Sequence, residues 1–536
     1  MAYRVHNIGL WLDEPESELT SQVASKLSVK KADVKNVRVV RQVLDARKKN
    51  SPRFIYTLEV ELDGAAKPKL PPDVSEVEEA PPLAPPLSKK PKKRPVIVGT
   101  GPAGLFAAFG LLERGIPSLL LERGRDVVQR RKDVAKLMRD GTLDPESNMN
   151  FGEGGAGAYT DGKLSTRINH PHVRKVIETF ARFGAPDRIL VDGKPHIGSD
   201  LLPLAVEKMR NELVAGGCEV RFETRVEDIL ARDGRVTGVK LHDGSVIDSD
   251  LVVLAPGNSA RELFHRFAAG HVVFVEAKPF ALGFRVEHPQ GLINDIQYGD
   301  KVAKNPRLPP ADYKLAENLE SAGETRGVYS FCMCPGGILV PTPTREGLQC
   351  TNGMSNSRRN SKFANAGIVA SVSVEDFARE GFTGPLAGLD FQEHWEAKAY
   401  ALGGGKFFAP SQSIPDYLAG TLKQPLPDTS YRPGLAHADL NLLFPPWLTQ
   451  ALKEALKKFE RRMRGFTSSH GQLMGVESRT SSPVRVTRNE KLESVSVSGL
   501  YPAGEGCGYA GGIVSSGIDG LRVAEAMCAV IEAGGA

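Results

Sequence analysis

The first 63 residues alternate between apolar and polar positions in three stretches. Residues 3–12 (YRVHNIGLWL), 36–45 and 53–62 show the two-residue period of a β-strand, and residues 17–28 show the spacing of a short helix. This pattern predicts a small α+β module over residues 1–63. Because no residue in it points to catalysis, we expect a structural role or a docking site for a protein partner.

Residues 64–94 lose this periodicity and are rich in proline and charge. The segment KLPPDVSEVEEAPPLAPPLSKKPKKRP lacks the apolar side chains of a core, so it predicts an extended linker. The linker ends in the basic residues Lys89, Lys90, Lys92, Lys93 and Arg94. Two interpretations remain open for this basic end, a solvated linker end or a contact with RNA or another acidic surface.

The main body opens with a strand–helix–strand pattern from residue 95 to about residue 121. Short apolar runs and two DG turns then predict a β-meander over residues 218–257, whose first strand is near 219–224 and whose last is near 250–255. A mixed pattern follows to about residue 480. From residue 499 a short strand, a glycine-rich turn and a final helix close the chain.

Size and composition limit the classes of protein to consider. With 536 residues the chain is too long for one ordinary core, and 41% hydrophobic and 25% charged residues are typical of globular proteins. The net charge of +5 is small for this length and does not favour nucleic acid or a membrane as the main partner. No apolar run approaches the ~20 residues of a membrane helix. With no signal-peptide pattern and six sparse cysteines, we expect a cytoplasmic protein with reduced thiols.

The pattern GxGxxG occurs three times, and its first occurrence stands in the context of a dinucleotide site. The strand PVIVG leads into Gly99, Gly101 and Gly104, a helix follows, and a second strand ends in Glu122. Gly99 permits a tight turn, Gly101 lets a pyrophosphate approach the backbone, and Gly104 lets helix and strand pack closely. The helix N-terminus attracts the phosphates, and Glu122 can accept hydrogen bonds from ribose hydroxyls.

The other two occurrences lack that context. The glycine loop, residues 152–157 in FGEGGAGAYTDGKLSTR, follows a polar segment rather than a buried strand. Its bare backbone N–H groups can still form a donor surface for a phosphate or a flavin carbonyl. The third occurrence, residues 506–511, lies between a strand and the last helix. It predicts a helix N-terminus directed at an anionic or polar ligand group, with Glu505 beside it.

Three segments together resemble the signature segments of two-dinucleotide-type flavoproteins: residues 95–124, 248–262 and 499–525. More narrowly, NFGEGGAGAYTDGKLSTR, GKPHIGSD, SFCMCPGG, TNGMSNSRRNSKFAN and VESRTSSPVRVTR are similar to an uncharacterised bacterial family of FAD-dependent dehydrogenases. This likeness covers nearly the whole chain. It implies FAD, rather than NAD, in the site between Gly99 and Glu122.

The resemblance also implies a role for each matching residue. Those that would hold the AMP half of FAD are Gly99, Gly101, Ala103, Gly104, Glu122 and Arg123. Those that would line the ribityl chain and the flavin ring are Gly504, Glu505, Gly512 and Ile513. Val226 would meet adenine through its backbone, and Gly257 would lie near the pyrophosphate. The glycine loop, with Gly155, would wrap the flavin where side chains would collide with the ring.

The chain departs from the wider flavoprotein group in one respect. Disulfide reductases of that type carry a second strand–GxGxxG–helix unit for NAD(P)H, and none is found between residues 258 and 500. NAD(P)H, a candidate transient co-substrate, would therefore dock without such a unit, or the substrate would supply the electrons. We accordingly predict an α/β fold with a Rossmann-like, doubly wound FAD-binding domain over residues 95–269 and 485–536. A mixed α+β substrate domain is inserted at residues 270–484.

Cys332 and Cys334 are the first candidates for chemistry beside the flavin. In an extended strand their Cα atoms would lie ~6.5–7 Å apart, at or beyond the limit for a disulfide. A bridge would need a bent backbone, which Pro335-Gly336-Gly337 could supply. Two interpretations stay open, small buried hydrophobes or a thiol that relays electrons or adds to the flavin ring. No His/Cys set has the spacing of a zinc site, so we expect no metal.

Two further groups of residues have alternative interpretations. His196, with Lys194 and Asp200 nearby, could polarise a substrate carbonyl or shuttle protons, or be an ordinary surface or core histidine. Arg479 and Arg485 could clamp a carboxylate, or line the FAD phosphates or a domain interface.

These observations predict an FAD-dependent oxidoreductase that transfers electrons between a small organic substrate and FAD. Two alternatives belong to other classes of protein. One is a non-enzymatic flavin-binding sensor or assembly protein, with residues 1–63 as its docking arm. The other is an RNA-linked flavoprotein that uses the basic linker end.

Overall fold

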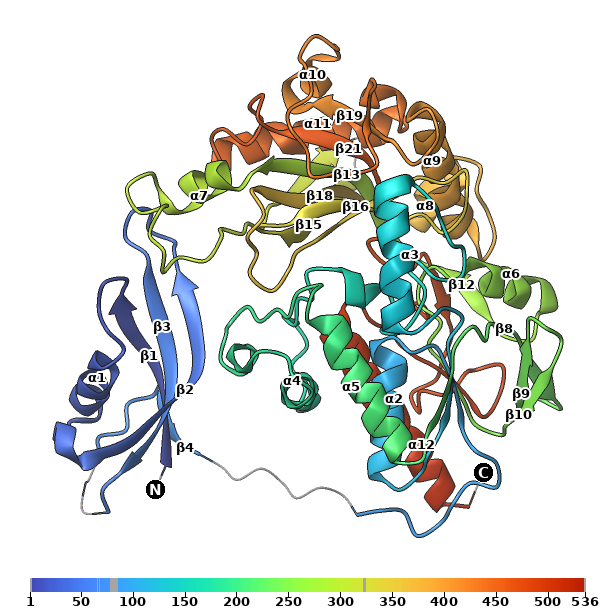
Figure 1. The fold of residues 1–536 in the computed structure, drawn as a ribbon, viewed down its shortest axis with the longest axis horizontal. Coiled ribbons are helices and arrows are strands. Elements are labelled where there is room, and N and C mark those ends of the chain that lie inside the picture. Colours follow the sequence, from blue (N-terminus) through green and yellow to red (C-terminus); the bar gives the residue numbers. More distant parts are fainter. Residues whose placement is uncertain (1, 65, 67, 78–84, 322–323, 535–536) are drawn as a thin grey trace.

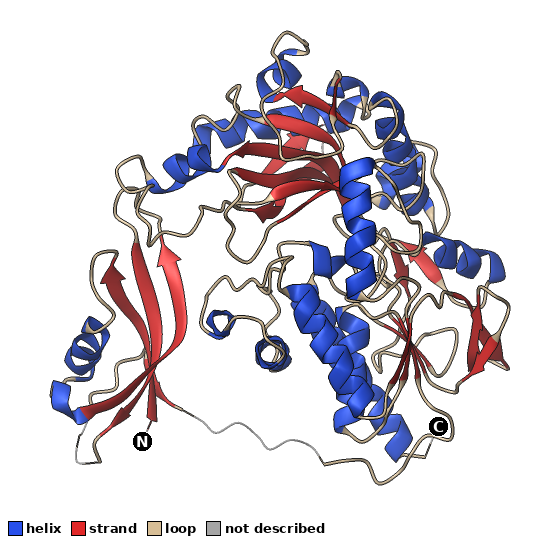
Figure 2. Ribbon diagram, viewed as in Figure 1, coloured by secondary structure: helices blue, strands red, loops and turns tan. Residues whose placement is uncertain are grey.

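The computed structural model describes residues 2–64, 66, 68–77, 85–321 and 324–534 of this mixed α/β protein. Figures 1 and 2 show three groups of elements: a small N-terminal module at the left, a large sheet with helices over it at the top, and a parallel sheet flanked by helices at the lower right. No helix in the described ranges is long and apolar enough to cross a membrane.

The N-terminal module is a sheet with one helix against it. Its strand order is β2 (Val34–Asp45), β3 (Arg53–Leu62), β1 (Ala2–Trp11) and β4 (Val74–Glu76), and the helix is α1 (Glu18–Leu27). The first three strands and the helix agree with the predicted pattern. The prediction of a linker throughout residues 64–94 is wrong, because β4 pairs with β1 inside that range. Residues 65, 67 and 78–84 of the predicted linker lie outside the described residues.

The end of the predicted linker lies against the main body. Leu87 is buried there. Lys93 pairs with Asp250 at 3.2 Å, and Arg94 pairs with Glu219 at 3.1 Å. These ion pairs occupy part of the basic end that the RNA interpretation would need.

A five-stranded parallel sheet forms the centre of the main body. Its strand order is β23 (Leu500–Pro502), β11 (Val252–Leu254), β5 (Val96–Val98), β6 (Leu119–Leu121) and β7 (Glu219–Arg221). Both faces are buried, as the continuous apolar runs require. Ile97 faces a core formed with α2 (Pro102–Glu113), α5 (Leu202–Ala215) and α12 (Ile513–Glu532). Val96 and Val98 face a second core on the opposite side.

The predicted β-meander is only partly present. Its first and last strands, β7 and β11, belong to the parallel sheet, where they pair with β6 and with β5 and β23. The antiparallel part contains only β8 (Val226–Arg232), β9 (Arg235–Leu241) and β10 (Val246–Asp248). This small sheet packs with α6 (Arg261–Gly270) over the second core.

Helices α2 and α12 lie unusually close together because glycines stand at their contact. A Cβ at Gly520 would overlap the carbonyl oxygen of Ala103, and one at Gly110 would lie 2.7 Å from the Cβ of Ala524. Two segments about 400 residues apart in the sequence therefore pack side by side, as Figure 1 shows.

The second large sheet is built from residues between 280 and 477. Its strand order is β14 (Ala316–Ser321), β15 (Glu324–Cys334), β18 (Phe363–Val372), β13 (Phe280–Pro289), β21 (Gln472–Glu477), β19 (Ala409–Ser413) and β20 (Leu435–His437). The helices of this part are α7 (Gln290–Tyr298), α8 (Val374–Arg379), α9 (Ala387–Leu402), α10 (Ile414–Ala419) and α11 (Pro446–Arg462). Alternation along β13 assigns Phe284 and Val286 to the core formed with these helices, whereas Arg285 points to the other face.

The chain leaves and re-enters the parallel-sheet region through a two-stranded ribbon. Its strands are β12 (Val275–Ala277) and β22 (Val484–Val486). They lie near the predicted ends of the inserted domain; the domain boundaries themselves stay a prediction. The remaining elements are α3 (Val127–Asp140), α4 (His172–Arg182), β16 (Ile338–Pro341) and β17 (Thr351–Met354).

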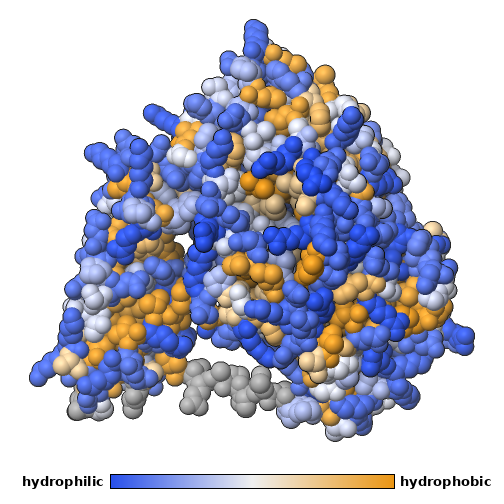
Figure 3. Space-filling view, viewed as in Figure 1, coloured by the Kyte–Doolittle hydropathy of each residue, from blue (hydrophilic) through white to orange (hydrophobic). Residues whose placement is uncertain are grey.

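The N-terminal module touches the main body at three places. At one of them the guanidinium of Arg307 donates to the backbone carbonyls of Leu12 and Glu14, the second at 3.1 Å. Backbone hydrogen bonds join Gln42 to Val191 and Gly193, at 2.7 Å each, and Asn50 to Tyr298 at 2.6 Å. In Figure 3 apolar side chains gather on the lower half of the module.

Candidate functional site

One cavity of about 460 Å³ lies at the carboxyl ends of the parallel strands β5, β6, β11 and β23. Crevices at this edge of an open α/β sheet are the usual position for a ligand. The predicted residues that line it are Gly99, Gly101, Ala103, Glu122, Arg123, Gly155, Val226, Gly257, Cys332, Gly504, Glu505, Gly512 and Ile513. The predicted cofactor residues are thus brought together, although they come from five distant segments of the chain.

Gly104 is the predicted cofactor residue that does not line this cavity. A Cβ there would overlap the carbonyl oxygen of Gly99 and lie 3.3 Å from Ile97 Cγ2. Gly99 itself has a φ of +98°, in the left-handed region, and a Cβ there would overlap the carbonyl oxygen of Ala255. Both glycines therefore serve the tight strand–turn–helix geometry.

Two helices begin at the cavity without a side chain that caps them. The N-cap of α2 is Gly101 and that of α12 is Gly512, and neither makes a side-chain capping bond. The first N–H groups of a helix have no intrahelical partner, and the helix dipole favours negative charge there. A Cβ at Gly101 would meet only the Cα of Gly155, at 3.8 Å, and one at Gly257 would meet nothing within 4 Å. The backbone is thus open to a close-lying anionic group such as a pyrophosphate.

Glu122 ties the first glycine turn to the glycine loop. Its Oε2 accepts hydrogen bonds from Thr100 N (3.1 Å) and Oγ1 (2.8 Å), and its Oε1 accepts from the N–H groups of Gly124 and Gly152, both at 3.0 Å. These four bonds take the usual acceptor positions of a carboxylate. A ribose hydroxyl at Glu122, which the resemblance implies, would have to share one of them.

Arg130 of α3 fixes the glycine loop, and sequence reasoning missed it. Its fully buried guanidinium donates to backbone carbonyls at 2.7–3.1 Å, those of Asn148, Met149, Gly152, Glu153 and Gly155. The signal for it was an arginine on the apolar side of a helix, one turn from the buried Val127 and Val134.

The glycine loop needs its glycines mainly for contacts within the protein. Gly152 has a φ of +113°, and a Cβ there would overlap Arg130 Cδ. At Gly154, with a φ of +83°, a Cβ would lie 3.1 Å from Ala158 Cβ. The expectation that side chains would collide with the flavin is therefore not the main reason at these two positions.

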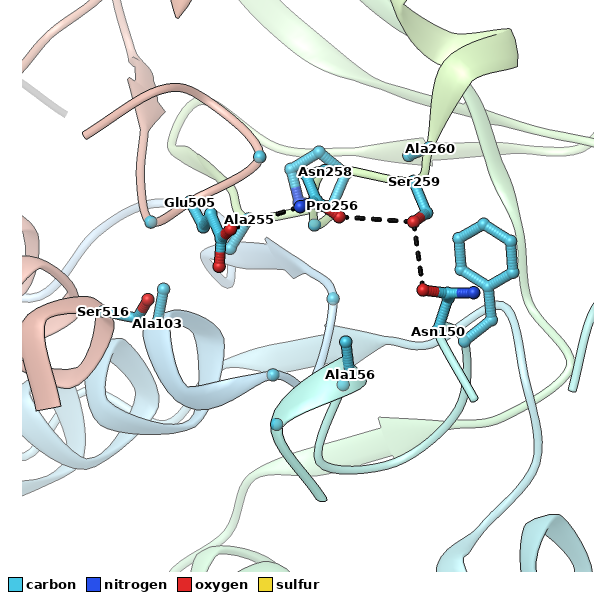
Figure 4. A pocket seen from close by; sticks show the side chains of 18 of the residues that line it. Ala103, Asn150, Ala156, Ala255, Pro256, Asn258, Ser259, Ala260, Glu505 and Ser516 are labelled. Atoms are coloured by element: carbon cyan, nitrogen blue, oxygen red, sulfur yellow. Dashed lines mark hydrogen bonds between the residues drawn. The ribbon is translucent and has the colours of Figure 1, made fainter. Parts of the chain in front are cut away.

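A chain of polar side chains crosses one wall of the cavity, as Figure 4 shows. Asn258 Nδ2 donates to Glu505 Oε1 at 3.2 Å. Ser259 Oγ lies 3.2 Å from both Asn258 Oδ1 and Asn150 Oδ1, and its one proton can be donated to either. Burial raises the pKa of Glu505 to about 7, with Lys278 opposing the shift. Near neutral pH this carboxyl can therefore either donate or accept a hydrogen bond.

Arg479 lines the cavity, but its guanidinium is paired with one buried carboxylate, that of Glu396. Its guanidinium pairs with Glu396 at 3.0 Å and donates to Ser259 Oγ at 2.9 Å, and Arg261 of α6 also pairs with Glu396, at 2.8 Å. This arrangement favours the domain-interface interpretation of Arg479. Arg485 lies in the two-stranded ribbon, where it pairs with Glu276 at 3.3 Å.

Cys332 lines the cavity at a bend in β15. The pairing of β15 with β18 shifts register between Phe331 and Cys334, and Cys332 has a φ of +41°. Cys334 is buried, and its Sγ lies 3.3 Å from the Cys332 carbonyl oxygen. Both thiols are free. The bend therefore lies at Cys332 itself and not at residues 335–337, where the sequence suggested it.

Two cations lie beside the cysteines. Arg285 Nη2 donates to the Cys332 carbonyl at 2.7 Å and lies 3.5 Å from Cys334 Sγ. Lys163 Nζ lies 3.9 Å from Cys334 Sγ. A hydrogen bond from the Cys334 thiol, with the charges of Lys163 and Arg285, holds the pKa of Cys332 well below its usual value. The same hydrogen bond and burial raise the pKa of Cys334.

These cations are themselves held by buried carboxylates. Glu477 pairs with Arg285 at 2.7 Å, with both side chains fully buried. Asp161, also buried, pairs with Lys163 at 3.1 Å and with Arg359. Sequence reasoning named none of these residues as site residues. The only signal was an arginine that follows the apolar run FALGF at the start of the strand FALGFRVEHP.

The predicted catalytic residues His196 and Lys194 do not line the cavity. Lys194 Nζ pairs with Asp312 at 2.8 Å, and its side chain is 56% exposed. His196 Nε2 lies 3.1 Å from the Ser357 carbonyl oxygen, and burial lowers its pKa to about 4, so it is neutral. The geometry gives no support to either catalytic role. The segment of His196 instead supports the site, because its backbone pairs with that of Lys163.

Among the described residues, no group of three or more His, Cys, Asp or Glu side chains is placed to hold a metal ion.

Comparisons with families and relatives cover nearly the whole chain. Residues 279–480 match the family "FAD-dependent protein, C-terminal domain-like", and residues 3–61 match a domain of unknown function. An uncharacterised protein from Clostridium beijerinckii is 40% identical over 535 residues, which is 98% of each chain.

Similarity to solved structures is more distant. The flavin-dependent brominase Bmp2 has a TM-score of 0.37 at 12% identity, over 82% of this chain and 79% of that chain. Glycine oxidase from Bacillus cereus has a TM-score of 0.32 at 12% identity, over 83% and 98%. CtdE in complex with FAD has a TM-score of 0.31 at 11% identity, over 81% and 83%. Similarities this low support no inference about activity. From the full-length relative and the matched domain family, the chain belongs to an uncharacterised family of FAD-dependent proteins.

Proposed function

We propose that this protein is an FAD-dependent oxidoreductase that transfers electrons between a small organic substrate and FAD. One observation carries the proposal: a single cavity holds two uncapped helix N-termini, the glycine turns and the Cys332 thiol. FAD, when bound there, supplies the two-electron redox chemistry. The remaining work of binding, orientation and charge control falls to the residues of this chain.

The residues present fit FAD at the places where its charged groups would bind. The open backbone at Gly101 and Gly257 accommodates the pyrophosphate, and the N–H groups that open α2 and α12 can donate to it. Near neutral pH Glu505 can hydrogen-bond a ribityl hydroxyl in either protonation state. Val226 lines the same cavity, at a position suited to adenine.

The thiol end of the cavity provides groups that act on a substrate. Lys163 presents a cationic donor beside Cys332, and both side chains line the cavity. The pairing of Lys163 with Asp161 fixes that charge in place. An oxygen of a carbonyl or carboxylate substrate would be bound at Lys163, with its reacting atom near the flavin and Cys332.

NAD(P)H as a transient electron donor is a further part of the proposal. The described strands between residues 280 and 477 pair antiparallel except for β19 with β20, which is unlike a dinucleotide-binding sheet. A nicotinamide would therefore have to approach the cavity from outside without its own Rossmann unit.

The test is an anaerobic titration of the purified protein with NADPH, followed by its visible flavin band. Rapid bleaching supports an oxidoreductase that accepts electrons from a nicotinamide. A flavin that dithionite bleaches and NADPH does not points to another donor. A flavin that neither reagent reduces contradicts the proposal and favours a sensor or assembly protein, in which residues 1–63 would dock a partner.

A further inference from the structure

We propose that Cys332 and Cys334 form a redox-active thiol pair that exchanges two electrons with FAD in the cavity. This inference rests on the proposed function, because it needs FAD in the same cavity. It adds a second redox centre to the protein and identifies the thiol–disulfide couple as its chemistry.

The backbone is bent at the point where an i, i+2 pair of cysteines needs a bend. In a regular strand the two Cα atoms lie ~6.5–7 Å apart, which is at the limit for a disulfide. Here the register shift after Phe331 and the positive φ of Cys332 bend the strand between the two cysteines. The bend places the Cys334 thiol against the Cys332 carbonyl oxygen, at 3.3 Å.

The bend at Cys332 is strained, and strain of this kind is retained where it serves a function. A non-glycine residue with φ near +41° is strained and persists only when the surroundings enforce it. Arg285 enforces it here, because its guanidinium donates to the carbonyl oxygen of Cys332 at 2.7 Å. A cysteine that merely filled space would need neither the bend nor the buried cation.

The two thiols differ in the way that a redox pair requires. Cys332 is partly exposed and lines the cavity, whereas Cys334 is fully buried behind it. Only Cys332 can meet a ligand, and Cys334 is placed to close the disulfide. Their pKa shifts agree with this order, since the pKa of Cys332 is lowered and that of Cys334 is raised.

The other cysteines serve as an internal comparison. The remaining four, Cys218, Cys350, Cys507 and Cys528, are all buried. Burial raises the pKa of Cys507 to about 12, and it also raises the pKa of Cys350 and of Cys528. Of the six cysteines, Cys332 alone lines the cavity.

The electron exchange balances without a further reactant. The Cys332 thiolate and the Cys334 thiol give up two electrons and one proton as the S–S bond forms. Oxidised FAD, when bound in the cavity, would accept both electrons and that proton. In the reverse direction the Cys332–Cys334 disulfide would take the same two electrons and proton from the reduced cofactor, and the S–S bond would break.

The test counts electrons in the flavin-containing protein. The protein is oxidised with diamide, freed of the reagent and titrated with dithionite under anaerobic conditions. We expect wild type to take up four electrons per flavin, two for FAD and two for the disulfide. Cys332→Ser and Cys334→Ser should each take up two. Cys528→Ala, which removes a buried thiol outside the cavity, should take up four.

Peptide mass provides a readout that does not depend on the flavin. Trypsin releases residues 327–345, which contain Cys332 and Cys334 and no other cysteine. After diamide this peptide should resist alkylation and lack two hydrogen atoms; after dithionite both cysteines should be alkylated. A flavin-containing wild type that takes up two electrons, or whose diamide-treated peptide is alkylated twice, overturns the thiol pair and leaves the proposed function intact. A protein that binds no flavin overturns both.

Discussion

Gly101→Val separates a cofactor cavity from a merely structural turn. The N-cap of α2 has a φ of −70° and a ψ of 179°, which any residue adopts. A Cβ there meets only the Cα of Gly155, at 3.8 Å. Valine should therefore fold without a clash and direct its methyl groups into the space assigned to the pyrophosphate.

The size of the effect follows from the bonds that valine would block. A hydrogen bond to a charged group contributes about 1.5–3 kcal/mol. Loss of two such bonds from the first turn of α2 costs about 3–6 kcal/mol, or roughly 100- to 10,000-fold in the Kd for FAD. The apoprotein should lose much less, about 1 kcal/mol or below, because an N-cap glycine makes no side-chain capping bond.

The assay compares flavin content as purified, the Kd for FAD from fluorescence quenching, and urea unfolding of the two apoproteins. Gly291→Val is the matched control, because Gly291 lies in α7, outside the cavity, with nothing within 4 Å of its Cβ position. It should keep wild-type flavin content. A Gly101→Val protein that purifies with full flavin and an unchanged Kd would refute the assignment of the pyrophosphate position.

Three further changes probe the groups around the cavity. Lys163→Gln removes a cation that lowers the pKa of Cys332, so the pH midpoint of Cys332 alkylation should rise; an unmoved midpoint would exclude Lys163 as a source of thiolate stability. Arg130→Met removes the donor that the carbonyls of the glycine loop share. It should lower the free energy of unfolding in urea by about 4 kcal/mol and should also weaken flavin binding. A decrease below about 1 kcal/mol would contradict the conclusion that Arg130 fixes the loop. Glu505 has a folded pKa of about 7 against an ordinary 4.5, so it binds its proton more tightly when folded. Its contribution to the free energy of unfolding should fall by up to about 3 kcal/mol as pH rises from about 5 to about 8. Glu505→Gln should flatten that part of the pH profile, and an unchanged slope would rule the shift out.

The sequence pattern predicts correctly those helices and strands that pack against segments close to them in the sequence. The strand, turn and helix from residue 95 onward carry their own signals, a buried run followed by glycines and an apolar helix face. Strands β7 and β11 carry only three residues each, and nothing local distinguishes a parallel partner from an antiparallel one. Their pairing depends on β5, β6 and β23, which lie far away in the sequence. For the same reason the exposed edge strand β4 was predicted to be linker.

The candidate site could also be predicted only in part, because some of its residues lie far apart in the sequence. The cysteines stood out as residue types, and the structure places one of them in the cavity. Lys163 and Arg285, which determine the chemistry of the pair, lie 171 and 49 residues from Cys334. Pairing of β13 and β15 with β18 brings Arg285 to Cys334, whereas Lys163 comes from a loop outside the named strands. No spacing in the sequence indicates either contact. His196 attracted attention as a residue type, but its buried, neutral ring bonds to a backbone carbonyl instead.

The charged side chains around Cys332 and Cys334 stabilise a negative charge at this end of the cavity. Two groups of charged side chains meet at the Cys334 thiol: Lys163 with Asp161 and Arg359, and Arg285 with Glu477. Burial raises the pKa of Glu477 to about 7. Above that pH both carboxylates are ionised and these groups carry a net charge of +1, and burial makes an uncompensated charge costly. A thiolate on Cys332 neutralises it. When the disulfide forms, that negative charge leaves the sulfur and passes with the electrons to the cofactor. The charge of these groups is therefore balanced in both redox states of the proposed exchange, and it is unbalanced when disulfide and flavin are both oxidised, which favours the uptake of two electrons.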